Sequence, residues 1–226
     1  MFKKIARPYF RDFTNMKYSK GKMWIANSRL WKKAMSLWFP NFWGRDLDGE
    51  RANTMGLLKG RVGLVAIYSR TWAERQVETF VDEEVKSIIR NSGGRSQLLE
   101  LNIEEGRLFR GVLWAFRGSI REKRKETWQG YLVLSGIKDD AREILGLMNH
   151  KAGYVYLVDE EGKIRWAGCG DALPTEKEAL VGGLRRLIEE RKGGTQKRMV
   201  DVSAPRNNVN SIPKVEKAAG AAGSLL

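Results

Sequence analysis

The stretch Gly153–Ala172, GYVYLVDEEGKIRWAGCGDA, holds two apolar runs on either side of a short polar turn. Apolar segments joined by a turn that ends in glycine are typical of a β-hairpin. We therefore predict a hairpin here, with the four residues Asp159–Gly162 as its connection. The stretch also carries Cys169, the single cysteine of the chain. One cysteine excludes an internal disulfide and a multi-cysteine zinc site.

The segments before this hairpin alternate between strand and helix patterns. Arg61–Ser69 is an almost continuous apolar run, which predicts a strand covered on both faces. A helix is expected next, with a capping box at Thr71 and Glu74 and an end at Asn91. We predict further strands at 97–103 and 129–134, further helices at 108–116 and 144–148, and a charged connection at 117–126.

A last helix is predicted over 174–192, where Thr175 and Glu178 offer a second capping box. Strands separated by helices, followed by an antiparallel hairpin and a helix, predict an α/β fold with a central mixed β-sheet flanked by helices. That order is the thioredoxin-like arrangement. We place this domain at residues 36–192.

Two segments flank the predicted domain. Residues 1–35 hold ten lysines and arginines but one acidic residue, a composition typical of a mitochondrial transit peptide. Trp24, Trp31 and Trp38 recur every seven residues and predict a basic helix with an aromatic face, which either docks on the domain or meets a membrane. Residues 193–226 are rich in glycine, alanine, serine and asparagine, and we expect a disordered tail there.

The net charge of +14 is concentrated in the first 60 residues, where 13 lysines and arginines face 4 acidic residues. A basic arm of this kind suits nucleic acid or an anionic membrane surface. No apolar run reaches the roughly 18 residues that a membrane-spanning helix needs. With one cysteine and one histidine, His150, a cysteine–histidine metal cluster is not expected, and we predict neither a metal nor a cofactor.

The expected redox motif of the fold is missing. Thioredoxin-like redoxins place Trp-Cys-x-x-Cys at the start of the helix after the central strand. Here that strand leads into Thr71–Trp72, and Ala73 and Gln76 occupy the two cysteine positions. Disulfide exchange at this place is excluded, because it needs an activated thiolate and a resolving thiol. Trp72 is expected to pack at the helix start, with binding in the former active-site groove as the alternative.

Two residues leave other functions open. Copper chaperones of the Sco type share this fold and place a histidine before the hairpin, as His150 stands here. They also need a Cys-x-x-x-Cys pair for Cu(I), which this chain lacks. We expect Cys169 to be a partly buried, unreactive thiol. The alternatives are therefore a thiol or copper-handling protein that uses Cys169 or His150, and an RNA- or ribosome-associated basic protein.

Several segments together resemble one family: Leu37–Gly44 (LWFPNFWG), Gly63–Val77 (GLVAIYSRTWAERQV) and Leu145–Ala172 (LGLMNHKAGYVYLVDEEGKIRWAGCGDA). Over about residues 36–192 the chain is similar to the mitochondrial ATP synthase assembly factors of the Atp-ten family. The resemblance implies a non-enzymatic chaperone, bound peripherally to the matrix side of the inner mitochondrial membrane. It also implies binding of newly made subunit a (subunit six) and help in its assembly with the ring of subunit c. No nucleic-acid partner is expected.

We predict that a protein partner binds at the hairpin and its exit. Arginine and tryptophan are typical interface anchors, and along the second strand Ile164 and Trp166 alternate with Arg165 and Ala167. One of these faces must be covered by helices, so Trp166 as a core residue is the alternative. The predicted partner-binding residues are Tyr154, Tyr156, Arg165, Trp166, Cys169 and Trp72. The charged segment Arg117–Lys125 is a second candidate.

Overall fold

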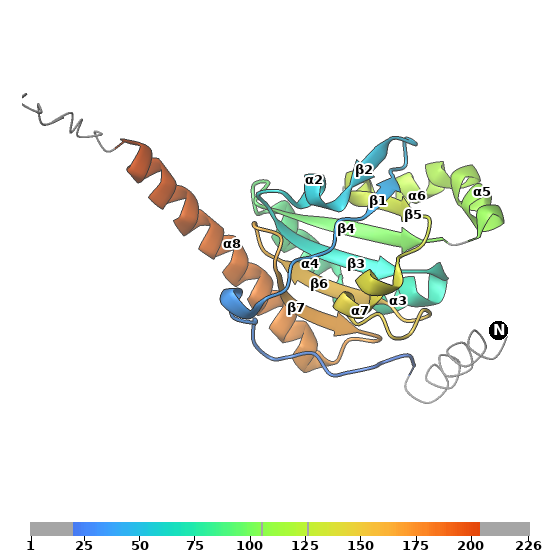
Figure 1. Cartoon of the computed structure of the whole chain (residues 1–226), viewed down its shortest axis with the longest axis horizontal. Coiled ribbons are helices and arrows are strands. Elements are labelled where there is room, and N and C mark those ends of the chain that lie inside the picture. Colours follow the sequence, from blue (N-terminus) through green and yellow to red (C-terminus); the bar gives the residue numbers. More distant parts are fainter. Residues whose placement is uncertain (1–19, 105, 126, 204–226) are drawn as a thin grey trace, which may run out of the picture.

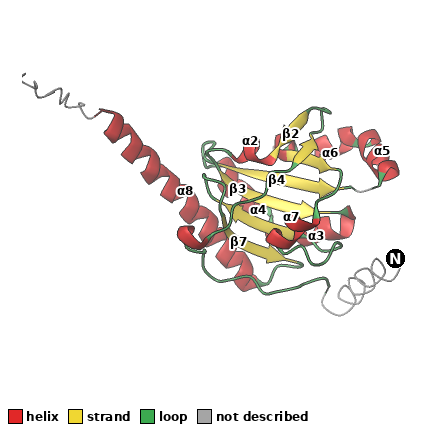
Figure 2. Ribbon diagram, in the orientation of Figure 1, coloured by secondary structure: helices red, strands yellow, loops and turns green. Residues whose placement is uncertain are grey.

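The computed structural model describes residues 20–203 except 105 and 126, with a seven-stranded mixed β-sheet at its centre (Figure 1). Helices cover both faces of the sheet (Figure 2). The strands are β1 (Trp43–Arg45), β2 (Arg51–Asn53), β3 (Val62–Tyr68), β4 (Ser96–Ile103), β5 (Tyr131–Leu134), β6 (Tyr154–Val158) and β7 (Ile164–Cys169). The α-helices are α2 (Thr54–Leu58), α3 (Arg70–Phe80), α4 (Glu83–Arg90), α5 (Arg107–Ala115), α6 (Arg117–Lys123), α7 (Asp139–Leu145) and α8 (Pro174–Ser203), with 3-10 helices η1 (Lys33–Met35) and η2 (Trp128–Gly130).

The strand order is β2-β1-β5-β4-β3-β6-β7. Strand β3 pairs in parallel with β4 and antiparallel with β6, and β4 pairs in parallel with β5. Every residue of β3 is buried, because both its edges and both its faces are covered. The predicted mixed sheet and its covered central strand are therefore confirmed.

The predicted hairpin is also confirmed. Strands β6 and β7 pair antiparallel, from Tyr154 opposite Cys169 to Val158 opposite Ile164. The carboxylate of Asp159 accepts backbone N–H groups of the turn, and Gly162 adopts φ 97°, a left-handed conformation that favours glycine. The turn is thus held by its own first and last residues.

The sheet separates two apolar cores. One lies under α3, α4 and α8 and includes Val77, Phe80, Trp166 and Leu184. The other lies on the opposite face, beside α2 and α7, and includes Phe39, Leu58, Leu145 and Tyr156. A central strand with both faces buried is typical of a three-layer α/β domain.

Two of the predicted helix starts are wrong. The long helix expected from Thr71 is two helices, α3 and α4, and Ser69 rather than Thr71 stands at the first N-cap. Helix α4 has its own cap, because the Asp82 carboxylate accepts the backbone N–H of Val85 at 3.2 Å. The charged connection expected at 117–126 contains helix α6.

Helix α8 also differs from its predicted bounds. It begins before Thr175, and Glu176 rather than Glu178 accepts a backbone N–H, that of Leu173, at 2.8 Å. The helix continues past the predicted end at 192 as far as Ser203 and projects from the sheet (Figure 1). Helix α8 thus includes residues 193–203 of the predicted tail, and residues 204–226 lie outside the described part.

The segment 20–39, called the N-terminal strap below, is not the helix that the tryptophan spacing predicts. Apart from the short η1 turn it has no regular helix, and it runs along the hairpin edge of the sheet (Figure 1). The basic arm is docked on the domain from Lys20 onward, as the docking alternative proposes. Residues 1–19 of the predicted transit peptide lie outside the described residues.

The α5–α6 segment is fastened to the sheet by a buried ionic cluster. The Arg124 guanidinium donates to the carboxylates of Glu100, at 3.0 Å, and Glu74, at 2.6 Å. Tyr68 donates from its hydroxyl to Glu100 at 2.6 Å. The side chains of Arg124 and Glu100 are almost inaccessible to solvent, so either charge left alone would be costly.

We predict that Arg124→Met lowers the free energy of unfolding by about 3 kcal/mol, because Glu100 would remain buried without its cation. Lys123→Met is the matched control. Its ammonium also binds Glu74, but Lys123 is exposed, so a loss below about 1 kcal/mol is expected. Urea denaturation of both variants measures the difference, and equal losses would contradict the assignment.

The ion pair between Arg124 and Glu74 predicts that the stability of the fold depends on pH. Burial by itself raises the pKa of Glu74, but the hydrogen bond and charge of Arg124, helped by Lys123, lower it below its ordinary 4.5. This stabilisation is complete above that ordinary value and is lost as the pH falls through the folded pKa. The stability gap between the wild type and Arg124→Met should therefore narrow from neutral pH to about pH 3.

Candidate functional site

The two positions that carry thiols in redoxins are buried in this structure. Ala73 and Gln76 are both buried in α3. The Gln76 carboxamide accepts the backbone N–H of Gly153 at 2.9 Å and donates to the carbonyl of Lys20. The second cysteine position thus holds an amide that joins the N-terminal strap to the start of the hairpin.

Trp72 and His150 lie at the surface near this position. Trp72 is 50% exposed, so the prediction that it packs at the helix start is wrong. His150 is exposed, and its Nδ1 lies 2.8 Å from Nη1 of Arg142. Within the described residues, no group of three or more histidine, cysteine, aspartate or glutamate side chains is arranged to hold a metal ion.

The predicted hairpin site is covered rather than exposed. Tyr154 donates from its hydroxyl to the carbonyl of Asn149 at 2.9 Å, and Tyr156 donates to that of Leu145 at 2.7 Å. The indole of Trp166 packs in the core and donates to the strap at 2.7 Å, so the core alternative holds for this residue. Both faces of β7 are buried, and the expectation of one open face is wrong.

Arg165 is buried between the hairpin turn and the N-terminal strap. Its guanidinium donates to the carboxylate of Asp159 at 3.3 Å and to the carbonyl of Trp31 at 2.9 Å. A partner could reach Arg165, Trp166 or Cys169 only after the strap had moved. Their role in partner binding stays a prediction, and Trp72 alone of the six predicted residues has a half-exposed side chain here.

Cys169 is a buried thiol beneath the strap. Its Sγ accepts the backbone N–H of Met23 at 3.3 Å and donates to the carbonyl of Trp24 at 3.6 Å. Burial raises the pKa of this thiol above its ordinary value, and the two strap contacts and the charge of Lys22 oppose that rise without cancelling it. Because the thiolate is the reactive form, Cys169 is expected to react slowly.

The N-terminal strap closes the outer edge of β7. The backbone N–H of Trp31 donates to the carbonyl of Arg165, and that of Ile164 donates to Leu37, both at 2.8 Å. Further along, Phe39 donates to Gly162 at 2.8 Å. An uncovered edge strand exposes unpaired backbone groups that can pair with another chain, and the strap covers these groups on β7.

The outer side of the strap forms one wall of an open apolar groove, and α7 with the segment after it forms the other. The groove has a volume of about 540 Å³. Met35 is 80% exposed and Met148 is 59% exposed, and both line it. The apolar residues of the groove are Trp24, Trp31, Met35, Leu37, Ile144, Leu145, Met148, Tyr156, Ile164 and Ala167.

Sequence reasoning missed this groove, since it placed Ile144 and Met148 together in one short helix. In the structure, α7 starts earlier and ends at Leu145, and Gly146 turns the chain with φ 65°. Met148 therefore stands outside the helix. No local pattern could reveal the groove, because its two walls are more than a hundred residues apart in the chain.

An open apolar groove has the chemistry of a site for an apolar segment. Contiguous exposed apolar patches mark interaction sites in folded proteins. Methionine side chains adapt to many shapes, and such grooves accept amphipathic or apolar helices. Lys32 and Glu143 place one charge of each sign on the lining, so the groove is not selective for a strongly charged ligand.

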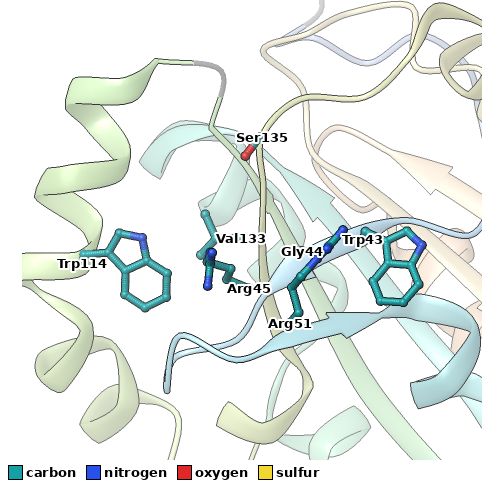
Figure 3. Close-up of a pocket in the computed structure, with 7 residues that line it drawn as sticks. All are labelled: Trp43, Gly44, Arg45, Arg51, Trp114, Val133 and Ser135. Atoms are coloured by element: carbon teal, nitrogen blue, oxygen red, sulfur yellow. The ribbon is translucent and has the colours of Figure 1, made fainter.

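A second hollow lies at the β1–β2 end of the sheet, with a volume of about 360 Å³. Figure 3 shows Trp114 of α5 on one side, Trp43 of β1 on the other, and Arg45 between them. Arg51 lies over the Trp43 ring, with its guanidinium carbon 5.2 Å from the ring centroid. This hollow is basic and aromatic, and it shares no lining residue with the apolar groove.

We predict that the strap is part of the mature fold. A chain starting at residue 36 should unfold at lower urea concentration and expose Cys169 to alkylation at neutral pH, because Met23 and Trp24 no longer cover the thiol. A chain starting at residue 20 should match the full chain in both measurements. If the chain from residue 36 is equally stable and equally unreactive, the strap is dispensable.

Comparison with known proteins gives the fold and the family. A Bacteroides thetaiotaomicron solution structure of a candidate protein disulfide isomerase aligns with a TM-score of 0.51 and 16% identity, over 71% of this chain and 93% of that chain. This likeness confirms the thioredoxin-like fold.

Within the described residues, no helix is both long enough and apolar enough to cross a membrane.

The chain is similar to curated fungal proteins named mitochondrial ATPase complex subunit ATP10. That of Saccharomyces cerevisiae is 29% identical over 191 residues, 75% of this chain and 66% of the yeast protein. That of Eremothecium gossypii is 27% identical over 188 residues, 77% of this chain and 67% of the relative. The alignments thus span about two thirds of each relative. A family profile described as ATP10 protein matches residues 1–187, most of the sequence, and the chain therefore belongs to the ATP10 protein family.

Proposed function

We propose that this chain is a non-enzymatic assembly chaperone of the mitochondrial ATP synthase. It binds newly made subunit a (subunit six) and aids the union of that subunit with the ring of subunit c. Its place is the matrix side of the inner mitochondrial membrane, to which it is bound peripherally. The family membership supports the ATP synthase as the target, and the names of the relatives support the mitochondrion.

The observation that carries the proposal is the open apolar groove. A membrane subunit has apolar segments that must be shielded from water until it is inserted or assembled. The groove offers a surface of matching chemistry, mostly apolar and with two exposed methionines, Met35 and Met148, on its walls. We therefore place the client at the groove rather than on the covered strands of the hairpin.

The absence of a thiol pair supports a chaperone over an enzyme. Ala73 and Gln76 stand at the two thiol positions, and Cys169 is buried with a raised pKa. One alternative, thiol or copper handling by Cys169 or His150, finds no support among the described residues, since the cysteine is beneath the strap and the histidine is at the surface. The groove needs neither residue.

We predict that Met148→Glu lowers the capture of subunit a about tenfold, because a bound apolar segment would bury an unpaired carboxylate. The measurement is recovery of radiolabelled translation products on the tagged full chain in isolated mitochondria. Met55→Glu is the matched control, since Met55 is also exposed but lies on α2, outside the groove.

Two results would contradict this proposal. If Met148→Glu and Met55→Glu capture subunit a equally, the groove is not the client site. If Cys169→Ser or His150→Ala abolishes capture while the protein stays folded, that result supports the thiol or copper alternative and contradicts the chaperone proposal. Loss of capture in Met148→Glu with wild-type stability in urea supports the groove directly.

A further inference from the structure

The β1–β2 hairpin and the α5–α6 segment lie beside each other at the end of the sheet away from β7 (Figure 1). Trp114 of α5 lines two hollows. One contains Arg45 and Arg51, and the other contains Asp48 and Arg117. The two segments are therefore neighbours in space, although some sixty residues separate them in the chain. We call this the basic–aromatic surface, defined by Trp43, Arg45, Arg51, Val112, Phe116 and Arg117.

Large apolar side chains on this surface point into solvent. Phe116 is 61% exposed, Trp43 is 56% exposed and Val112 is 49% exposed. Val112 and Phe116 are four residues apart and so share one side of the helical segment. Leu113 and Ile120, in contrast, pack against the core beneath α5 and α6. The α5–α6 segment thus packs one apolar side against the core. Its second apolar side, with Val112 and Phe116, is covered by no other described residue.

The charge of the surface is strongly positive on its helical half. Residues 107–125 contain seven lysines and arginines and one acidic residue. Lys123 and Arg124 are engaged with Glu74 and Glu100, and Arg121 pairs with Asp48. No ion pair between described residues involves the three exposed cations Arg45, Arg51 and Arg117. Arg45 donates one N–H to the carbonyl of Gly49 at 2.6 Å, and Arg51 lies over the Trp43 ring. Neither contact neutralises the charge, so the three cations can still attract an anionic ligand.

One acidic residue of this region, Glu122 of α6, pairs with Lys125 at 2.5 Å. The others lie in the β1–β2 turn and are Asp46, Asp48 and Glu50. The carboxylate of Asp46 accepts the backbone N–H groups of Asp48 and Glu50, both at 2.9 Å, and is thereby used within the turn. Asp48 is occupied by Arg121. Glu50 is the exposed acidic side chain that partly offsets the arginines, and the surface still keeps a cationic surplus.

We propose that the basic–aromatic surface binds a bilayer that contains anionic phospholipids. Val112, Phe116 and Trp43 enter the interface, and Arg45, Arg51 and Arg117 contact lipid phosphates. Apolar and aromatic side chains flanked by arginine are the pattern of an interfacial membrane contact. Each cation near an anionic bilayer contributes on the order of 1 kcal/mol. This inference takes the peripheral membrane location from the proposed function and adds the surface that makes the membrane contact.

RNA is the other polyanion that a basic surface with aromatics attracts. RNA-binding surfaces stack bases on flat aromatic side chains. Val112 is aliphatic and offers no stacking face, yet about half of its surface is open to solvent. An aliphatic–aromatic pair on the exposed side of a helical segment gains more from hydrocarbon than from bases. The composition of the surface therefore favours lipid.

The test is vesicle flotation with the purified full chain. Vesicles of phosphatidylcholine with phosphatidylglycerol should carry the protein upward, and vesicles of phosphatidylcholine alone should carry about tenfold less. Binding should fall as salt rises, because exposed charges are screened. Phe116→Glu combined with Val112→Glu should lower binding to the anionic vesicles about tenfold. The control variant Met55→Glu changes an apolar residue of α2 that is 41% exposed, and it should bind like the wild type.

Any of the following three outcomes would contradict the proposal. Unchanged flotation of the double variant would mean that the surface does not contact lipid. Binding that is lost only on removal of residues 1–19 would place the contact on the basic arm. Displacement of the protein from vesicles by single-stranded RNA, with tighter RNA binding lost in the double variant, would make the surface a nucleic-acid site. Capture of subunit a from detergent extracts tests the chaperone role separately, since it needs no bilayer.

Discussion

The buried carboxylate of Glu176 holds the N-terminal strap, the hairpin exit and α8 together. One oxygen accepts the Lys22 ammonium at 2.7 Å and the backbone N–H of Leu173 at 2.8 Å, and the other accepts the backbone N–H of Ala26 at 2.6 Å. The same ammonium donates to the carbonyl of Cys169 at 3.0 Å. A carboxylate with 1% side-chain exposure needs these partners, because an unpaired charge inside a protein is costly. The strap is therefore fixed at the point where it first meets the domain.

Two further properties depend on this fixed strap. The Gln76 carboxamide binds its first carbonyl, and Cys169 lies beneath it, so the region where redoxins carry out thiol chemistry is closed by the same segment. Its outer side, with Met35 and Leu37, supplies one wall of the apolar groove. In this protein the loss of the thiols and the presence of the groove are thus parts of one arrangement. Where redoxins carry the second thiol, this protein has an amide that binds the strap, and the outer side of the strap lines an apolar groove.

Much of the fold could be predicted from the sequence because strong local patterns determine it. The apolar run of β3 and the turn at Asp159–Gly162 are both found where expected. The errors come from long-range contacts. The tryptophan spacing suggested a helix, but backbone hydrogen bonds to β7 keep the strap extended. The short strands β1 and β2 carry three residues each, too few for a period to be recognised. The burial of the predicted site residues in the hairpin could not be foreseen for the same reason, since the strap that covers them is placed by long-range contacts.

The central claim is that the apolar groove holds a membrane subunit. Site-specific photocrosslinking in mitochondria during translation tests it most directly, with the photoreactive residue at position 148 in the groove, at 72 beside the former thiol site, or at 55 on α2. The account predicts a crosslink between position 148 and radiolabelled subunit a, and none above background from position 55. A crosslink from position 72 without one from position 148 would contradict it and would return the client to the site of the lost redox chemistry.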